Sequence, residues 1–418
     1  MVNRKIVIDK PVALVLGGTN PHIELIRQLK ERGYYVVLVD YTESPPAKKH
    51  ADVHEQESTM DPETVLKVAK KYNAGLVMSA CVDQANITAC YVAEKMGLTK
   101  PYSYKTASEI TNKGYMKKMM MQHGVPTTRY YYLENGEELS AFDLKFPVMT
   151  KPADSCAASG VKKANNKEEL EIFLAEAKKV SRTGRTVVEE VANGVEVSAY
   201  CFVKNHKAHI IMVSERISVI EGDAQVLKCY ATVSPPNITT AAMNKIPKAA
   251  EGIATAFELD NTPLHVQAIC NGDDINIIEF APRVGGGISY ETIRENTGFD
   301  IISATIDSYL EKDVDLQYNK MTQYCSVNLI YGVPGIFDYL DGAEELISEG
   351  VIDSLHYHKT SGAHIDDSRA SGGRIAAFVV HADTREKMLR KIEYAMNKME
   401  AYDKDGNKIM RKDLFYRG

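Results

Sequence analysis

The chain has 418 residues, of which 44% are hydrophobic and 25% charged, as in soluble globular proteins of two or three domains. Its net charge of −6 argues against a nucleic-acid-binding protein, which usually carries a basic excess. No apolar run reaches the about 18 residues of a membrane-spanning helix, so we expect no membrane segment. The N-terminus lacks the apolar core of a signal peptide, and the seven cysteines show no CxxC spacing, which predicts reduced thiols in a cytoplasmic protein.

The N-terminal part of the sequence alternates apolar runs with helical patterns. Val12–Leu16 and Tyr35–Val39 are continuous apolar runs typical of buried parallel strands, and apolar residues at helical spacing lie between them up to Gly33. The pattern continues with a helix near Pro62–Tyr72, a strand at Gly75–Ser79 and a helix near Gln84–Met96. Alternating strands and helices predict a parallel α/β sheet.

The turn after the first strand reads Gly17-Gly-Thr-Asn-Pro-His22 and does not fit GxGxxG, so an NAD-dependent enzyme is only an alternative. The helix N-terminus after Gly18 predicts instead a modest anion site for the carboxylate or phosphate of a non-nucleotide substrate, with His22 as a second candidate. Asp40 and Asp83 follow later strands, where open α/β sheets bind ligands. The alternative for His22, Asp40 and Asp83 is a role as helix caps and turn residues.

A lysine and a run of small residues in the middle of the chain predict a phosphate-binding flap. Phe146–Lys151 is a short strand that ends in Lys151, a compact cation for the α- and β-phosphates of a nucleotide. The next segment is rich in small residues, whose backbone N–H groups can fold over phosphates. Its candidate contacts are Ser155, Ser159 and Gly160. The alternative is a polar surface loop.

The segment Thr186–Tyr200 is a predicted strand–turn–strand unit with glutamates suited to a nucleoside. The Glu189 side chain, or the backbone beside it at Glu190 and Val191, can accept a hydrogen bond from the adenine 6-amino group, and apolar neighbours would enclose the ring. Glu196, seven residues after Glu189, can hold both ribose hydroxyls. The segment therefore predicts the hinge of a nucleotide site.

The region between Gln267 and Glu279 predicts a β-hairpin. Val266–Ile269 and Ile275–Phe280 are apolar runs that flank the turn-prone Asn271-Gly-Asp-Asp. The hairpin would bring Gln267 and Glu279 together, and both offer the oxygen atoms that Mg²⁺ or Mn²⁺ prefers when it also holds nucleotide phosphates. We therefore predict these two residues as metal ligands. The alternative is an ordinary hairpin with an exposed glutamate.

A fixed cation and a glycine triplet follow the hairpin. Arg283 presents a planar fork of donors, and the triplet lets the backbone approach a bound anion. The triplet consists of Gly285, Gly286 and Gly287. Arg294, at the next helix, together with His22 suggests a pocket for a small anionic metabolite or amino acid. The sequence does not choose among an amino acid, a sugar acid and a purine precursor.

Residues 313–418 predict a last α+β unit. Tyr324–Gly332 and Gly373–Ala382 have the composition of strands, and Arg385–Met399 carries apolar residues on one helical face.

Taken in order, these segments resemble the ATP-grasp ligases. The string Glu279-Phe-Ala-Pro-Arg283 is similar to the family's Glu, apolar, Asn, Pro, Arg, and the spacing of Glu189 and Glu196 matches as well. Two departures concern the metal. Gln267 replaces an acidic residue, which has a precedent in the carbamoyl-phosphate synthetase large subunit, and Ala281 replaces the Asn. Water or another group must then fill one coordination position, or one of the usual two metals is weakly held.

The resemblance adds further residues and roles. Asn112-Lys113 stands at the place of the family's Asp-Lys pair, whose lysine touches ATP phosphate. In the flap, Cys156, Ala157 and Ala158 fill positions at which the family commonly has more glycine, with an arginine or serine before the last one, so the lid is expected to be stiffer. The catalytic residues that the resemblance implies are Arg283, Glu279 and Lys151, with Arg283 holding the transferring phosphoryl group or the substrate carboxylate.

The fold implied is α/β and α+β: an N-terminal parallel α/β domain (1–105), a two-lobed ATP-grasp domain (106–312, with a mobile lid lobe at about 127–198) and a small C-terminal α+β domain (313–418). The implied activity is an ATP- and Mg²⁺-dependent ligase that joins a small carboxylate to an amine through an acyl phosphate and releases ADP and phosphate. Related ligases are often homodimers. The alternative from another class is a non-catalytic ATP-binding regulatory protein, since Gln267 and Ala281 weaken the metal site.

Overall fold

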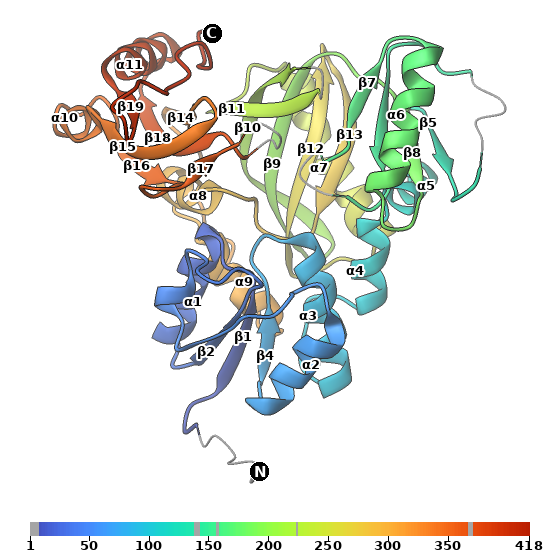
Figure 1. Ribbon diagram of the computed structural model, residues 1–418. Helices are drawn as coiled ribbons and strands as arrows, with labels where there is room; N and C mark the ends of the chain where they lie inside the picture. Colours follow the sequence, from blue (N-terminus) through green and yellow to red (C-terminus); the bar gives the residue numbers. More distant parts are fainter. Residues whose placement is uncertain (1–7, 138–142, 156–158, 223–224, 367–370) are drawn as a thin grey trace.

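A computed structural model describes residues 8–137, 143–155, 159–222, 225–366 and 371–418. Figure 1 shows an N-terminal α/β part (blue) below a large central sheet (green to yellow), with a smaller sheet at one side and the C-terminal strands (orange to red) at the other. No helix within these ranges is long and apolar enough to cross a membrane. The mixed architecture expected from the sequence is confirmed.

The N-terminal part is a four-stranded parallel sheet with the strand order β3-β2-β1-β4. The central strand β1 is almost completely buried because helices cover the sheet on both faces. Its strands and α-helices are β1 (Val12–Leu16), α1 (Asn20–Glu31), β2 (Tyr35–Val39), β3 (Val53–Glu55), α2 (Pro62–Lys71), β4 (Leu76–Met78) and α3 (Asp83–Met96). The strands and helices predicted here are confirmed to within a residue at each end.

A smaller antiparallel sheet, with the order β5-β8-β6-β7, follows two helices and packs against α6. Leu170 and Leu174 of α6 are buried against Val148 and Val188 of this sheet. The elements are α4 (Tyr104–Thr111), α5 (Lys113–Gln122), β5 (Tyr130–Leu133), β6 (Val148–Pro152), β7 (Lys162–Ala164), α6 (Lys167–Val180) and β8 (Thr186–Glu190). The sheet lies within the range predicted for the lid lobe.

The largest sheet has eight antiparallel strands in the order β13-β12-β9-β10-β11-β14-β18-β16. One hydrophobic cluster contains Leu25 of the N-terminal part together with Phe202 and Ile302 of the central part, so the two parts share a core. The central elements are β9 (Val195–Lys204), β10 (Lys207–Glu221), β11 (Val226–Ser234), α7 (Thr240–Ala256), β12 (Thr262–Asn271), β13 (Asp274–Ala281), α8 (Ser289–Thr297) and α9 (Ile301–Tyr309).

The C-terminal strands continue the central sheet, since β14 pairs with β11 and is followed by β18 and β16. A three-stranded sheet, β17-β15-β19, lies beside them. The elements are β14 (Tyr324–Tyr331), β15 (Gly335–Asp341), α10 (Ala343–Ser348), β16 (Ser354–Tyr357), β17 (His364–Ile365), β18 (Arg374–Ala382), α11 (Arg385–Lys398) and β19 (Glu400–Asp403). The expected boundary at residue 312 therefore divides one continuous sheet, and the domain boundaries stay predictions.

Candidate active site

Gln267 on β12 and Glu279 on β13 face each other across the hairpin that the sequence predicts. They are register partners, and the hairpin closes at the paired residues Asn271 and Asp274. Directly opposed residues of an antiparallel pair lie on the same face with Cβ atoms about 5 Å apart. A register shift after Gln267 marks a bulge, which bends a strand locally. The hairpin therefore presents an amide and a carboxylate side by side.

A cleft beside Glu279 brings together segments that are far apart in the sequence. Lys113 of α5 places its Nζ 3.8 Å from Oε1 of Glu279 and donates to the backbone carbonyl of Ser155 at 2.8 Å. The lining residues are Asp83, Gln84, Ile110, Thr111, Lys113, Met116, Ser155, Glu279 and Phe280. Three of the predicted nucleotide-site residues thus share one surface.

Lys113 is positioned by the start of α5. Asn112 is the N-cap, and its side-chain oxygen accepts from the backbone N–H of Tyr115 at 3.1 Å. The backbone N–H of Lys113 donates to the carbonyl of Ala153 at 3.0 Å, which ties the helix to the end of β6. Asn and Asp are about equally good N-cap residues, so Asn112 caps α5 as well as an aspartate at this position would.

Lys151 is paired with Glu189 on the neighbouring strand. Nζ of Lys117 lies 2.6 Å from Oε2 of Glu189, and Lys151 pairs with the other carboxylate oxygen. Burial alone would raise the pKa of Glu189, but the two lysines outweigh it and lower this pKa to about 2. The Glu189 side chain is thus occupied by the two lysines and the Thr128 hydroxyl, and a contact with adenine, through this side chain or the backbone beside it, stays a prediction.

Sequence reasoning missed Lys117. It lies four residues after Lys113 on α5, and residues at this spacing lie on one helical face. The apolar face of the same helix carries Met116 and Met120, which are buried. The spacing of the two lysines was the signal available, but it does not reveal the carboxylate 72 positions further on, at Glu189.

The residues at the end of β8 lead from the smaller sheet to β9. Glu190 lies 3.3 Å from the guanidinium of Arg129, and the backbone N–H of Val191 donates to the carbonyl of Pro147 at 3.4 Å. Both residues are therefore held at the join between the smaller sheet and the central sheet, where the hinge was predicted. Their contacts with adenine stay predictions.

Glu196 lies near the start of β9 and is paired with Arg216 on β10 at 2.7 Å. Ser198 is the register partner of Gln267, and Glu196 precedes Ser198 by two residues. Because side chains alternate along a strand, Glu196 lies on the same sheet face as Gln267 and Glu279. The predicted ribose and metal ligands therefore belong to one surface.

The described ends of the predicted flap are held by hydrogen bonds. Oγ of Ser155 donates to the carbonyl of Ser159 at 2.8 Å, and Asp154 accepts from the backbone N–H of Thr183 at 3.0 Å. Gly160 has a φ of +72°. Residues 156–158, from which we inferred a stiffer lid, lie outside the described residues.

Arg283 forms a two-point ion pair with Asp83 at the start of α3. Its Nε and Nη2 donate to the two carboxylate oxygens at 2.8 and 3.0 Å, and Nη1 donates to the carbonyl of Val284 at 3.0 Å. Burial alone would lower the pKa of Arg283, but Asp83 outweighs it, so the pKa lies above its ordinary value. The predicted anion-binding cation is thus fixed by a carboxylate of the N-terminal part.

The glycine triplet turns the chain from β13 toward α8. A Cβ at Gly285 would lie 2.6 Å from Cε1 of Tyr200 and 2.7 Å from Oγ of Ser289, so no side chain fits there. Gly287 has a φ of +67°, which other residues rarely adopt. Gly286 faces open space. Packing accounts for Gly285, and an anion contact of the triplet stays a prediction.

Gly18 and His22, two predicted substrate residues, have structural roles. His22 is completely buried, and its ring contacts the Thr19 hydroxyl at 2.9 Å and the Ser79 hydroxyl at 3.1 Å. Burial lowers the pKa of His22 to about 4. A Cβ at Gly18 would lie 2.4 Å from Cβ of Pro45. The buried ring takes part in the cap of α1, as the alternative reading of His22 expects, and a contact of His22 with substrate stays a prediction.

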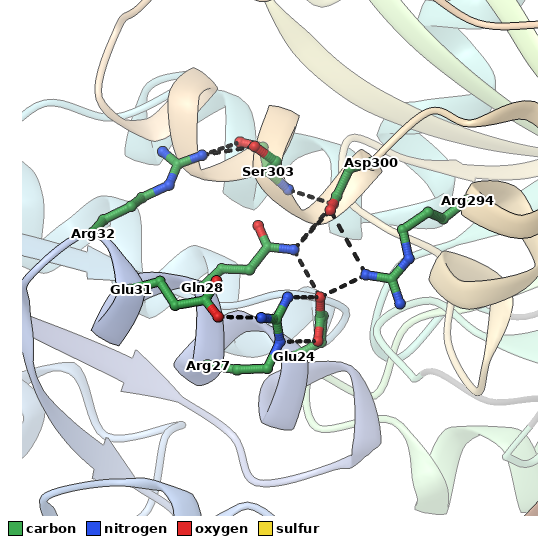
Figure 2. A network of polar contacts seen from close by, with 8 residues as sticks. All are labelled: Glu24, Arg27, Gln28, Glu31, Arg32, Arg294, Asp300 and Ser303. Atoms are coloured by element: carbon green, nitrogen blue, oxygen red, sulfur yellow. Dashed lines mark hydrogen bonds and ion pairs between the residues drawn. The ribbon is translucent and has the colours of Figure 1, made fainter.

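Arg294, another predicted substrate residue, joins α8 to α1. It donates to Oε1 of Glu24 at 2.8 Å and lies 3.8 Å from Asp300. Figure 2 shows that Gln28 of α1 also reaches Asp300, at 2.9 Å. Gly18, His22 and Arg294 are absent from the lining of the cleft beside Glu279. The structure therefore gives Arg294 an interdomain role, and its contact with substrate stays a prediction.

The side chains beside the cleft fit a Mg²⁺ ion held largely by nucleotide phosphates. Glu279 and Gln267 offer a carboxylate and an amide oxygen, whereas Ala281 offers none. A nucleotide-bound Mg²⁺ needs only one or two carboxylates and completes its octahedron with phosphates and water. Within the described ranges, no group of three or more His, Cys, Asp and Glu side chains can hold a metal ion by itself. Metal binding is therefore expected to depend on the nucleotide.

The sequence of residues 144–291 matches the ATP-grasp domain family. Among curated proteins, the chain is 28% identical over 173 residues to the mitochondrial ammonia carbamoyl-phosphate synthase of Aquarana catesbeiana, covering 41% of this chain and 11% of that protein. It is 25% identical over 327 residues to the human trifunctional purine biosynthetic protein adenosine-3, covering 73% of this chain and 32% of that protein. The chain thus spans about a third or less of the length of these relatives.

Solved structures are similar over nearly the whole chain. The L-amino acid ligase from Bacillus licheniformis has a TM-score of 0.77 at 16% identity, covering 95% of this chain and 100% of that chain. The phosphoribosylglycinamide synthetase from Anaerococcus prevotii has a TM-score of 0.74 at 20% identity, with the same coverage. These likenesses show the fold. The segment that matches the ATP-grasp domain family, residues 144–291, lies within this shared fold.

Proposed function

We propose that this protein is an ATP- and Mg²⁺-dependent ligase. It joins a small carboxylate to an amine through an acyl phosphate and releases ADP and phosphate. The observation that carries the proposal is the cleft in which Glu279 meets Lys113 and Ser155, with Gln267 opposite Glu279 on the hairpin. The proposal is further supported by the names of similar proteins, among them an L-amino acid ligase and a carbamoyl-phosphate synthase.

The nucleotide would lie between the smaller sheet and the central sheet. Lys113 and Lys151 supply cations for its phosphates, and the N–H groups of the flap close over them. The flap residues are Ser155, Ser159 and Gly160. The hinge backbone at Glu190 and Val191 would bind adenine, and Glu196 would bind the ribose hydroxyls.

Glu279 and Gln267 would hold the metal ion. When bound, Mg²⁺ neutralises the charge that develops as the phosphoryl group is transferred. Phosphoryl transfer depends on positioning and electrostatics more than on proton transfer, so the chain needs no acid–base pair at this site. Lys113 adds a positive charge on the same side of the cleft as Glu279.

The carboxylate substrate would be received beside Arg283. An arginine has five N–H donors. In the protein Nε and Nη2 of Arg283 donate to Asp83, and Nη1 donates to the Val284 carbonyl and lies 3.5 Å from Nδ1 of His265. The second N–H of Nη2 therefore remains for a carboxylate or a phosphoryl oxygen, while Asp83 keeps the guanidinium in place. We also propose the domain division at residues 105 and 312, a homodimer and a cytoplasmic location.

ADP release from Mg-ATP tests the proposal. The full chain would be assayed against pooled amino acids and other small carboxylates, alone and together with amines. Release that requires one carboxylate and one amine is the expected result. Hydroxylamine in place of the amine should trap the acyl phosphate as a hydroxamate. Tight nucleotide binding without ADP release in any pool would refute a ligase and leave a non-catalytic nucleotide-binding protein.

A further inference from the structure

The carboxylate of Glu189 is held between two lysines in the interior of the hinge region. Nζ of Lys117 lies 2.6 Å from Oε2, and Lys151 contacts Oε1. The exposed fractions of the side chains are 2% for Lys117, 4% for Glu189 and 10% for Lys151. Two cations and one anion leave an excess of one positive charge when both lysines are protonated, and this excess lies next to the proposed phosphate site.

The two lysines differ in how firmly they are held. Lys117 also donates to the hydroxyls of Thr127 and Thr128, at 3.0 and 3.1 Å, so its ammonium has three protein partners. Lys151, within the part of the chain that the structure describes, is bound through Glu189 alone. Lys151 therefore has one interaction to give up, whereas Lys117 is anchored.

The anchor of Lys117 lies where the smaller sheet joins the central sheet. The hydroxyl of Thr127 donates to the carbonyl of Ile277 on β13 at 2.8 Å, and that of Thr128 donates to Glu189 on β8 at 3.2 Å. Lys117 thus contacts Thr127, which is hydrogen-bonded to the hairpin of β12 and β13, and Thr128, which is hydrogen-bonded to the smaller sheet.

An ionised carboxylate that loses its counter-ion in the protein interior is costly, because neither water nor a second charge compensates it. The low pKa of Glu189, about 2, means that this carboxylate stays charged at neutral pH. If Lys151 leaves Glu189 for a phosphate, another cation must remain on the carboxylate.

We propose that Lys117 is a positioning residue that compensates Glu189, so that the ammonium of Lys151 can exchange this carboxylate for the phosphates of a nucleoside diphosphate or triphosphate. The inference rests on the proposed nucleotide site. It assigns to Lys117 no contact with the nucleotide itself. Glu189 then serves as the resting partner of Lys151 when no nucleotide is bound.

The test is a calorimetric titration of the full chain with Mg-ADP, which avoids turnover. Lys117→Met should weaken Mg-ADP binding at least 10-fold, because Lys151 then remains on Glu189. In a protein that already carries Lys151→Met, adding Lys117→Met should lower the affinity for Mg-ADP little further. Lys118→Met is the matched control, since Lys118 is the exposed neighbour on the same helix and should leave the affinity unchanged.

A second substitution separates this function from a purely structural one. Glu189→Gln added to Lys117→Met releases Lys151 and should restore Mg-ADP affinity to that of Glu189→Gln alone. Unchanged affinity in Lys117→Met, or no restoration in the double variant, overturns the inference. If Lys117→Met does not fold, the double variant is compared with Glu189→Gln alone. A weaker Mg-ADP affinity of the double variant then overturns the inference. Absence of Mg-ADP binding by the unsubstituted protein refutes the proposed function, and with it the inference.

Discussion

At the residue scale, Glu279 is the one carboxylate of the hairpin face that lies in the cleft. Glu279→Gln should lower ADP formation by roughly 100-fold or more, because a neutral amide replaces the charge that we propose holds the metal ion. The fold should persist, since the side chain is about one-third exposed. Circular dichroism and ADP release measure the two effects. Asp274→Asn on the same strand is the control, and full activity of Glu279→Gln would remove Glu279 from the site.

His22 should make stability depend on pH. In the unfolded chain its pKa is near 6.5, and in the folded protein burial lowers it to about 4. Between these values the unfolded state binds more protons, so stability should fall as pH drops from about 6.5 to about 4. The loss contributed is about 3 kcal/mol at most. Urea unfolding at several pH values should show a shallower slope for His22→Gln, whereas His123→Gln, at an exposed position, should keep the original slope.

At the scale of elements, the N-cap of α5 determines where Lys113 stands. Asn112→Ala removes the bond to the N–H of Tyr115 and should cost about 1 kcal/mol of stability. It should also weaken Mg-ADP binding, because the helix start that carries Lys113 loosens. Thr384→Ala removes the N-cap of α11 and is the matched control. Its stability loss should be similar, with Mg-ADP affinity retained. If Asn112→Ala binds Mg-ADP as tightly as Thr384→Ala does, the cap does not position Lys113 for the nucleotide. Asn112→Asp retains a capping side chain and should bind Mg-ADP more tightly than Asn112→Ala.

The elements themselves were largely predictable from the sequence. Val12–Leu16, Tyr35–Val39 and the hairpin carrying Gln267 and Glu279 are confirmed, because buried strands and tight turns leave local signals. The partners of the site residues were not predictable. Asp83 meets Arg283 across 200 positions, and such a pair depends on how the elements pack. The cap role of His22 could not be chosen from the sequence, because its local sequence suits an anion site as well as a cap.

At the scale of the whole molecule, polar contacts attach α1 to α8 and α9. Arg294 reaches Glu24, Gln28 reaches Asp300, and Arg32 reaches Asp307 at 2.6 Å. Arg294→Gln should lower stability by about 1 kcal/mol, since the pair is partly exposed. Hydrogen exchange should rise in α1 and α8. Arg27→Gln, whose partners Glu24 and Glu31 both lie within α1, should leave exchange in α8 unchanged.

The same variant tests the predicted contact between Arg294 and substrate. An interdomain role predicts an unchanged KM for the carboxylate once that substrate is found. A KM raised 10-fold or more, with exchange in α8 unchanged, would instead favour a direct contact of Arg294 with the substrate.

The continuous eight-stranded sheet bears on how the protein can be divided. A fragment ending at residue 312 would lose β14 and expose the main-chain hydrogen-bonding groups of Ala231–Ser234 on β11. An uncovered edge strand pairs readily with other chains. Such a fragment, although it contains every proposed nucleotide contact, is expected to aggregate rather than to remain as an isolated nucleotide-binding module. Light scattering of the purified fragment would measure this, and a stable monomer would mean that β11 tolerates an open edge.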